Sequence, residues 1–485
     1  MKRSPLLATL LTGVTLSACA VGPDYRRPAV APSPAFKEAP STANGWVPAQ
    51  PMDTIDKGAW WSVFGDPVLD ALEERVAVSN QTLKAAEAAY RQARALTAAD
   101  QASLFPTVTL NGSNTSSHSG GGSATTVSSG VVTTAGRASN TSRYQASLGA
   151  TWAVDVWGRI RRQVESDRAG AQASAADVAN ARLSAQTQLA TDYFLLRTLD
   201  EQKALYDDTV AAYGKAATLT ENQYNAGVVA KADVITARTQ LLTARAQAAD
   251  VGVQRAQAEH AIAVLTGHAP SDLTLAVGER PKIVPTPPVG LPSELLQRRP
   301  DIAAAERQVA EANALVGVQT AAWFPSLTLS GSYGYSGTSL GNLFTAANNV
   351  WSVGPTLAAT LLDFGARQAR VSQARAAYDQ RVALYRQTVL TAFQQVEDQL
   401  VALRVLEQES ALRDEALASA RQAEALALNR YRAGQVDYTT VVQAQATALS
   451  AAQTVLTLTR QRQAASVALI EALGGGWTTA DLPRR

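Results

Sequence analysis

The sequence predicts an α+β fold that is built twice, with a pair of strands and a long helical hairpin in each copy. The first observation is an internal repeat, in which YNAGVVAKADV (224–234) is echoed by YRAGQVDYTTV (431–441), and DVWGR (155–159) by DFGAR (363–367). The second is a period-two alternation of apolar and polar residues, which is typical of strands. The third is a pair of proline-free, alanine- and leucine-rich stretches that are too long for a β sandwich. We therefore predict a tandem duplication.

The repeat sets the predicted boundaries along the 485 residues. The dipeptide that opens FPTVTL (105–110) returns in FPSLTL (324–329), and the first copy holds an additional Gly/Ser/Thr-rich tract at 112–142, predicted as a polar loop. The predicted parts are a signal peptide at 1–18, an extended segment at 19–62, a first repeat at 63–267, a Pro-rich linker at 268–291, a second repeat at 292–475 and a tail at 476–485.

Each repeat is expected to hold two strands, at about 104–114 and 142–155 in the first copy and about 324–336 and 350–363 in the second. In the second strand of the first copy, Tyr144, Leu148 and Trp152 belong to the apolar set that alternates with polar or small residues. Their length of roughly ten residues suits a strand that crosses a membrane with one face toward lipid. A soluble sandwich gives a similar alternation.

The helical stretches are expected at about 68–102 and 292–322 before the strands, and at about 158–225 and 366–432 after them. In the last of these, apolar residues from Tyr378 to Val396 recur at steps of four and three, the spacing of a coiled coil. Gly227 and Gly434 are predicted to turn the chain into a second helix, at about 231–266 and 437–473. Each copy therefore ends in an antiparallel hairpin.

The N-terminus resembles a bacterial lipoprotein signal. Met1-Lys2-Arg3 is followed by a mostly apolar stretch and by LSAC, whose Cys19 is the one cysteine of the chain. Cleavage before Cys19 would leave that thiol for a thioether-linked, palmitate-bearing lipid anchor, and Ala20 in the next position points to the outer membrane. No other cofactor is expected.

Composition excludes several classes of protein. The chain has 43 Lys and Arg against 41 Asp and Glu, and two of the basic residues lie in the signal, so nucleic acid is not an expected partner. The three histidines are scattered, and no metal site is expected. The sequence lacks the G-x-S-x-G, Walker A, G-x-G-x-x-G and H-E-x-x-H patterns, so no catalytic residues and no enzyme activity are predicted.

Four strands in lipid must close into a barrel, because unpaired backbone edges cost several kcal/mol each. Closure therefore requires several copies of the chain. A dimer would supply eight strands with a filled interior, whereas a trimer would supply twelve and leave a lumen.

CAVGPDYRRP after the lipobox, the repeated plan, YxAG at both turns and LGGGW near the end resemble the outer-membrane factors. These are the TolC-like, OprM/NodT-type lipoprotein channels of tripartite, RND-type efflux systems, which give multidrug resistance. The resemblance implies a homotrimer with a twelve-stranded transmembrane β-barrel and a long periplasmic α-helical barrel, anchored in outer-membrane lipid. It also implies a periplasmic adaptor (membrane fusion protein) and an inner-membrane RND-type transporter as partners, with passive conduction of small molecules such as drugs.

The resemblance also implies a gate at the periplasmic tip. Asp233 and Tyr431 match an aspartate and a tyrosine that hold the tip closed in that family, and Gly227 and Gly434 form the turns there. Thr440 and Gln443 stand where many relatives carry an acidic ring, so strong cation selectivity is not expected, and Asp437 is the acidic residue nearby. The alternatives are a lipid-anchored periplasmic coiled-coil scaffold and an outer-membrane channel for protein secretion.

Overall fold

The structure is a computed structural model that describes residues 20–30, 35–38, 59–120, 124–128, 131–135, 139–285 and 296–483. Its contacts divide the chain into two compact units. The sheet unit takes in Gln92–Ala171, Arg307–Val382 and the chain up to Arg27, and the helix unit takes in Pro28–Arg91, Gln172–Glu306 and Ala383–Arg485. Each unit draws on both sequence repeats, so the repeats are not the compact units.

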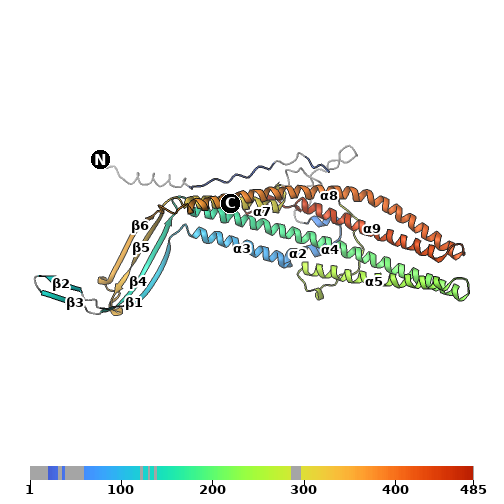
Figure 1. The fold of residues 1–485 in the computed structure, drawn as a ribbon, viewed down its shortest axis with the longest axis horizontal. Helices are drawn as coiled ribbons and strands as arrows, with labels where there is room; N and C mark the ends of the chain where they lie inside the picture. The colour runs from blue at the N-terminus through green and yellow to red at the C-terminus, as the bar shows by residue number, and fades with distance from the viewer. Residues whose placement is uncertain are drawn as a thin grey trace. The chain divides into compact units, whose positions relative to one another are not determined.

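The sheet unit holds one four-stranded antiparallel sheet. Its strands are β1 (Thr107–Ser119), β4 (Ser139–Val154), β5 (Ser326–Gly337) and β6 (Asn349–Ala358), in the order β1-β4-β5-β6, which lie side by side in Figure 1. The central pair joins the repeats, because β4 belongs to the first copy and β5 to the second, with Trp152 opposite Leu329. The predicted strand pairs and the α+β fold class are confirmed.

The prediction of a polar loop at 112–142 is partly wrong. β1 and β4 continue into it, and β2 (Ala124–Ser128) and β3 (Val131–Ala135) form a separate two-stranded ribbon. For β2 and β3 the physical reason is composition, because ATTVS and VVTTA are rich in Thr and Val, residues that favour extended backbone.

The helices follow the predicted order. They are α2 (Pro67–Ser79), α3 (Gln81–Ala102), α4 (Arg159–Asn225), α5 (Lys231–Leu265), α7 (Pro300–Ala321), α8 (Ala366–Arg432) and α9 (Tyr438–Ala472). The single helix expected at 68–102 is broken at Asn80, which has extended backbone angles and whose side-chain oxygen accepts from the Leu83 amide at 3.0 Å. None of the described helices is long and apolar enough to cross a membrane.

The helices of the two copies match residue for residue. α4 and α8 have 67 residues each, and α5 and α9 have 35 each. Gly267 ends α5 with φ +76°, and Gly474 takes the equivalent left-handed position after α9 with φ +94°.

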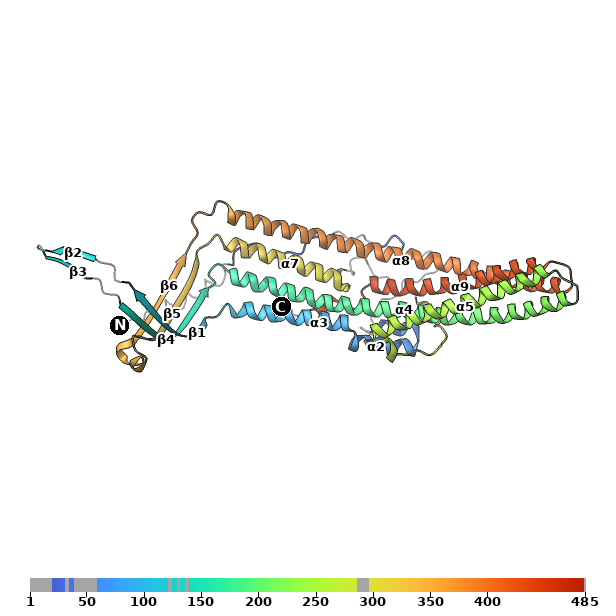
Figure 2. The ribbon, with the colours of Figure 1, turned by 60° about the horizontal axis from the view of Figure 1, so that its bottom comes forward.

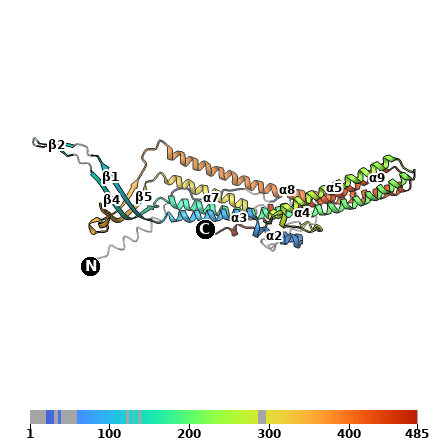
Figure 3. The same ribbon diagram turned by 90° about the horizontal axis from the view of Figure 1, so that it is seen from below.

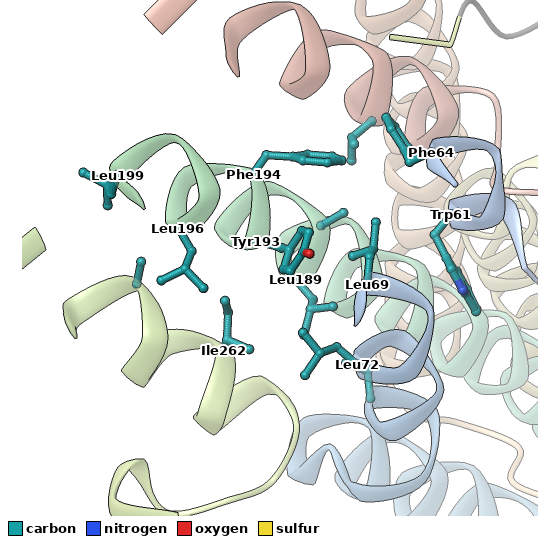
Figure 4. Packing of buried hydrophobic residues seen from close by; sticks show 14 of the residues in the cluster. Trp61, Phe64, Leu69, Leu72, Leu189, Tyr193, Phe194, Leu196, Leu199 and Ile262 are labelled. Carbon is teal, nitrogen blue, oxygen red and sulfur yellow. The ribbon is translucent and has the colours of Figure 1, made fainter. Parts of the chain in front are cut away.

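The main core lies in the helix unit, where a 3-10 turn (Trp60–Phe64), α2, α4 and α5 meet (Figure 4). Phe64 and Phe194 lie with ring centroids 4.9 Å apart. Glu73 shares the buried face of α2 with Leu69, Leu72 and Val76, and burial raises the pKa of its carboxyl to about 9. This core encloses a carboxyl group that is neutral at pH 7.

Candidate functional site

The two faces of the sheet differ in chemistry. Directly opposite residues on neighbouring strands share a face, so the strand register assigns every side chain to one side or the other. The apolar face carries Val108, Leu110, Ala146, Leu148, Ala150, Trp152, Val154, Leu327, Leu329, Tyr333, Tyr335, Trp351, Val353 and Leu357. The polar face carries Thr107, Thr109, Asn111, Ser113, Arg143, Gln145, Ser147, Thr151, Thr328, Ser330, Ser332, Ser352 and Thr356.

The apolar face is uncovered in the single chain. Trp351, Val353 and Leu357 are between 68% and 71% exposed. Contiguous apolar surface of this kind marks contact with a membrane or a protein partner. On the other face the hydroxyls of Ser332 and Ser352 lie 2.9 Å apart and present a hydrogen-bonding surface. The sheet therefore fits between an apolar and an aqueous environment.

Both outer strands of the sheet have an open edge. Among the described residues, β1 pairs with β4 alone and β6 with β5 alone. An open edge presents a row of N–H and C=O groups that invite another strand. The sheet is therefore incomplete in one copy of the chain.

The two hairpin turns lie at the same end of the helix unit (Figures 2 and 3). After α4, Gly227 has φ +75°, its amide bonds the Tyr224 carbonyl, and the Val228 amide bonds the Gln223 carbonyl. After α8, Gly434 has φ +70° and repeats both bonds with Tyr431 and Arg430. Both are Schellman motifs with glycine in the left-handed position, as expected from the sequence repeat.

Tyr431 and Tyr438 form a small core at the second turn. Their ring centroids are 5.3 Å apart, and they pack with Ala216 and Ala237 from the first hairpin. The Tyr431 hydroxyl donates to Gln223 Oε1 at 2.8 Å and lies 3.3 Å from the Thr220 hydroxyl. Burial raises the pKa of Tyr438 to about 12, and the phenols of Tyr431 and Tyr213 add to the shift. This cluster ties the second hairpin to the first.

The structure does not join Asp233 to Tyr431 within one chain. The Tyr431 hydroxyl is engaged by Gln223 and Thr220. Asp233 lies half-buried in the first turn of α5, and within the described residues its carboxylate makes no hydrogen bond or ion pair. A carboxylate in this position is available to a group from outside the chain.

The other predicted tip residues lie on one exposed face of α9. Asp437 is the residue before the helix and makes no side-chain capping bond, and Thr440 and Gln443 follow at intervals of three. Residues three apart are neighbours on a helix surface. The repeat places Thr440 at the position of Asp233, so the acidic residue of the first copy is a neutral hydroxyl in the second.

Sequence reasoning missed Gln223 and Thr220, the partners of Tyr431. Gln223 lies in the last turn of α4, and Thr220 is buried one turn earlier. Nothing in a single sequence distinguishes these side chains from the many other glutamines and threonines of α4. Only the packing of the two hairpins brings them to Tyr431.

Cys19 lies outside the described residues, but the segment that follows it is held in place. The Val21 amide bonds the Trp157 carbonyl at 3.1 Å. The buried Arg162 guanidinium donates to the Val21 carbonyl and, at 2.8 Å, to the Asp24 carboxylate, and lowers the pKa of Asp24. Asn313 on α7 bonds the Pro23 carbonyl at 2.9 Å. No group of acidic, histidine or cysteine side chains suited to a metal ion occurs in the described parts of the chain.

Comparisons with known proteins agree with this geometry. A family model described as outer membrane efflux protein matches residues 72–268 and 291–475. The chain is similar to the outer membrane protein OprJ of Pseudomonas aeruginosa, with 31% identity over 476 residues that cover 97% of this chain and 96% of OprJ. It is also similar to the probable efflux pump outer membrane protein TtgC of Pseudomonas putida, with 29% identity over 97% of this chain and 96% of TtgC.

Among solved structures, the outer-membrane channel OprN has a TM-score of 0.83 and 32% identity, over 95% of this chain and 100% of the OprN chain. The likeness extends to the arrangement of the elements as well as to their sequence. The chain belongs to the outer membrane efflux protein family, as predicted, and is a protein of the cell outer membrane and not an enzyme.

Proposed function

We propose that the chain is the outer-membrane channel subunit of a tripartite, RND-type efflux system, and that it conducts small molecules passively to the cell exterior. The observation that carries the proposal is the sheet, which has an uncovered apolar face, a hydroxyl-rich opposite face and two open edges. A strand arrangement of this kind fits a barrel wall between lipid and a water-filled lumen.

Closure of the barrel calls for further copies of the chain. Inside one chain, the second strand of the first repeat (β4) pairs with the first strand of the second repeat (β5). Continuing that pattern pairs β6 of one copy with β1 of the next. Three copies give about twelve strands and a lumen, whereas two give about eight and a filled interior. We therefore propose a homotrimer.

The helix unit supports the same assembly. Ile235 and Leu242 are exposed on α5 and lie seven residues apart, and Val405, Leu412 and Leu426 on α8 are exposed at multiples of seven. Apolar residues at this spacing form one stripe along a helix and pack into a coiled-coil seam. In the proposed trimer these stripes are the seams between neighbouring copies.

The proposed partners are a periplasmic adaptor protein and an inner-membrane RND-type transporter that supplies the energy. Relatives of this chain are named for antibiotic, toluene and cation efflux, so the same architecture occurs with very different exported compounds. Serine and threonine hydroxyls on the polar face suit a weakly selective pore. Acylation of Cys19 would hold the protein in the membrane, and the bonds of Val21 and Asp24 to Arg162 would fix the anchor near the sheet unit.

The gate proposal assigns different roles to Asp233 and Tyr431. Tyr431 holds the second hairpin against the first through Gln223. Asp233, whose carboxylate is unengaged within the described chain, bonds a neighbouring copy in the closed tip. A hydrogen bond to a charged group is worth about 1.5–3 kcal/mol, and a trimer has three of them.

Conductance of purified protein in planar lipid bilayers tests the function and the gate together. The native channel is expected to show small closed-state conductance, and Asp233→Ala to show larger and more frequent openings. Asp437→Ala, which removes an exposed acidic residue near the same tip, is the matched control and should behave like the native protein. An unchanged Asp233→Ala conductance would refute the lock. No conductance in any variant, with protein inserted, would favour the scaffold.

A further inference from the structure

At the junction between strands and helices in the sheet unit, an aromatic contact joins the two repeats. Trp157 lies in the turn between β4 and α4, and Phe324 lies just before β5. Their rings stack with centroids 4.8 Å apart and planes 23° from parallel. The indole Nε1–H of Trp157 also donates to the Pro325 carbonyl at 2.8 Å. A turn residue of the first repeat is thus packed on the Phe-Pro pair of the second.

Each repeat contains both halves of this contact. Phe364 precedes Gly365 (φ +93°) as Trp157 precedes Gly158 (φ +79°). Phe105 leaves α3 with a bond from its amide to the Ala102 carbonyl at 3.0 Å, and Phe324 leaves α7 with the same bond to Ala321 at 3.1 Å. The chain therefore holds a second aromatic turn residue and a second Phe-Pro pair that are equivalent to the first.

The second set is left uncovered in one chain. Phe364 is 93% exposed and Phe105 is 69% exposed. Phe364 has φ +51°, a left-handed conformation that is disfavoured for a bulky residue. The two residues adjoin opposite edges of the sheet, because Phe105 precedes β1 and Phe364 follows β6. They lie where two copies of the chain would meet.

We propose that Phe364 of one copy packs on Phe105 and Pro106 of the next, so that the contact between copies repeats the contact within the chain. The inference rests on the proposed trimer and names the surface by which the sheets join. The occupant is a second copy, because the chain itself supplies the template in Trp157, Phe324 and Pro325. The open edges of β6 and β1 place the same two residues beside the proposed strand pairing.

The contact between copies differs from its template in two ways, and the first is the turn backbone, because Phe364 has φ +51° whereas Trp157 has no positive φ. The second is a side-chain group. Phe364 has no ring N–H, so the bond that Trp157 makes to Pro325 has no counterpart at Pro106. The junction within the chain combines stacking with a hydrogen bond, and the junction between copies relies on apolar contact. This difference allows a test by a substitution that should stabilise the trimer, because a tryptophan in place of Phe364 would supply the missing N–H donor.

The first test is cross-linking of membrane-extracted protein by a short bis-maleimide. Phe105→Cys combined with Phe364→Cys should give dimer and trimer bands, and either single variant should not, which also controls for Cys19. The matched control combines Phe105→Cys with Phe344→Cys, a residue that is 70% exposed in the loop at the other end of the strands. A trimer by mass without cross-linking in the first pair overturns this inference and leaves the channel intact. Absence of any trimer overturns the proposed function.

The second test measures the temperature at which the trimer dissociates in detergent. Phe364→Trp supplies the missing N–H donor and should raise that temperature by several degrees, whereas Phe364→Ala should lower it. Phe344→Trp adds the same indole away from the junction and should leave the temperature unchanged. If Phe364→Trp and Phe344→Trp behave alike and Phe364→Ala has no effect, Phe364 does not lie between copies.

Discussion

The two hairpin turns of the helix unit share one backbone but differ at six of eleven positions, YNAGVVAKADV against YRAGQVDYTTV. Gly227 and Gly434 hold the same left-handed position with the same pair of hydrogen bonds. Tyr224 of the first turn is 41% exposed, whereas its equivalent Tyr431 is 5% exposed. Duplication has preserved the turn, and the chemistry at the tip has diverged.

The divergence places a buried pair of tyrosines in the second copy, whereas the equivalent residues of the first copy are exposed. The second turn carries Tyr438, which is 1% exposed, where the first carries the exposed Lys231. The first turn carries Asp233 where the second carries Thr440. We infer that the second turn anchors the tip within a copy through its buried tyrosines, whereas the equivalent residues of the first turn face their surroundings.

The largest expected effect comes from Tyr438→Ala, which empties the core of the second turn. Removal of a buried aromatic side chain costs about 3 kcal/mol or more. Thermal unfolding in detergent should shift to lower temperature, and closed-state leak should rise. Lys231→Ala at the equivalent position should change neither. If both variants behave alike, the two tips do not differ in the way described.

Tyr431→Phe is expected to have the next largest effect. It removes the hydroxyl that donates to the half-buried Gln223 side chain at 2.8 Å, and loss of one such hydrogen bond costs up to about 1.5 kcal/mol. Single-channel recordings should show more frequent openings. Tyr224→Phe is the matched control, because that tyrosine is half exposed, and equal effects of the two would contradict the asymmetry.

Substitution of the two turn glycines tests the backbone and not the side chains, and here the two turns should lose the same stability. An added Cβ at Gly227 or Gly434 meets no atom within 4 Å, so alanine costs only the left-handed backbone, about 1 kcal/mol. Gly227→Ala and Gly434→Ala should lower the unfolding temperature by the same small amount. Unequal losses would show that the two turns are not equivalent in backbone.

The smallest expected effect concerns alkaline pH. Burial raises the pKa of Tyr438 to about 12, so between pH 10 and 12 the unfolded phenol ionises while the folded one stays neutral. Stability should therefore fall as pH rises through this range, by about 1 kcal/mol near pH 11. Tyr438→Phe should lessen the fall between pH 9 and pH 11 in unfolding experiments. An equally steep fall in that variant would assign the pH dependence to other groups.

Much of the fold is predictable from local sequence signals. The helix turns follow from glycine in YxAG, since only glycine adopts the left-handed position without strain. The strand pairs follow from alternation, and the ends of α4 and α8 fall within a residue of those expected. The break at Asn80 was not predicted, because the bond from its side chain to the Leu265 carbonyl is a tertiary contact.

The candidate site is less predictable for the same reason. Tyr431 was identified through family resemblance, but its partners Gln223 and Thr220 come from a helix more than 200 positions earlier in the chain. The pairing of Trp157 with Phe324 likewise joins residues of different repeats. Such contacts depend on how distant parts of the chain pack together, and local sequence patterns do not predict that packing.

Native mass spectrometry of protein extracted from the outer membrane determines whether three copies of the chain close into one channel. A single species is expected, with the mass of three chains that lack residues 1–18 and carry lipid on Cys19. A lipidated monomer that stays folded without detergent after removal of the lipid would contradict the channel and leave a tethered scaffold.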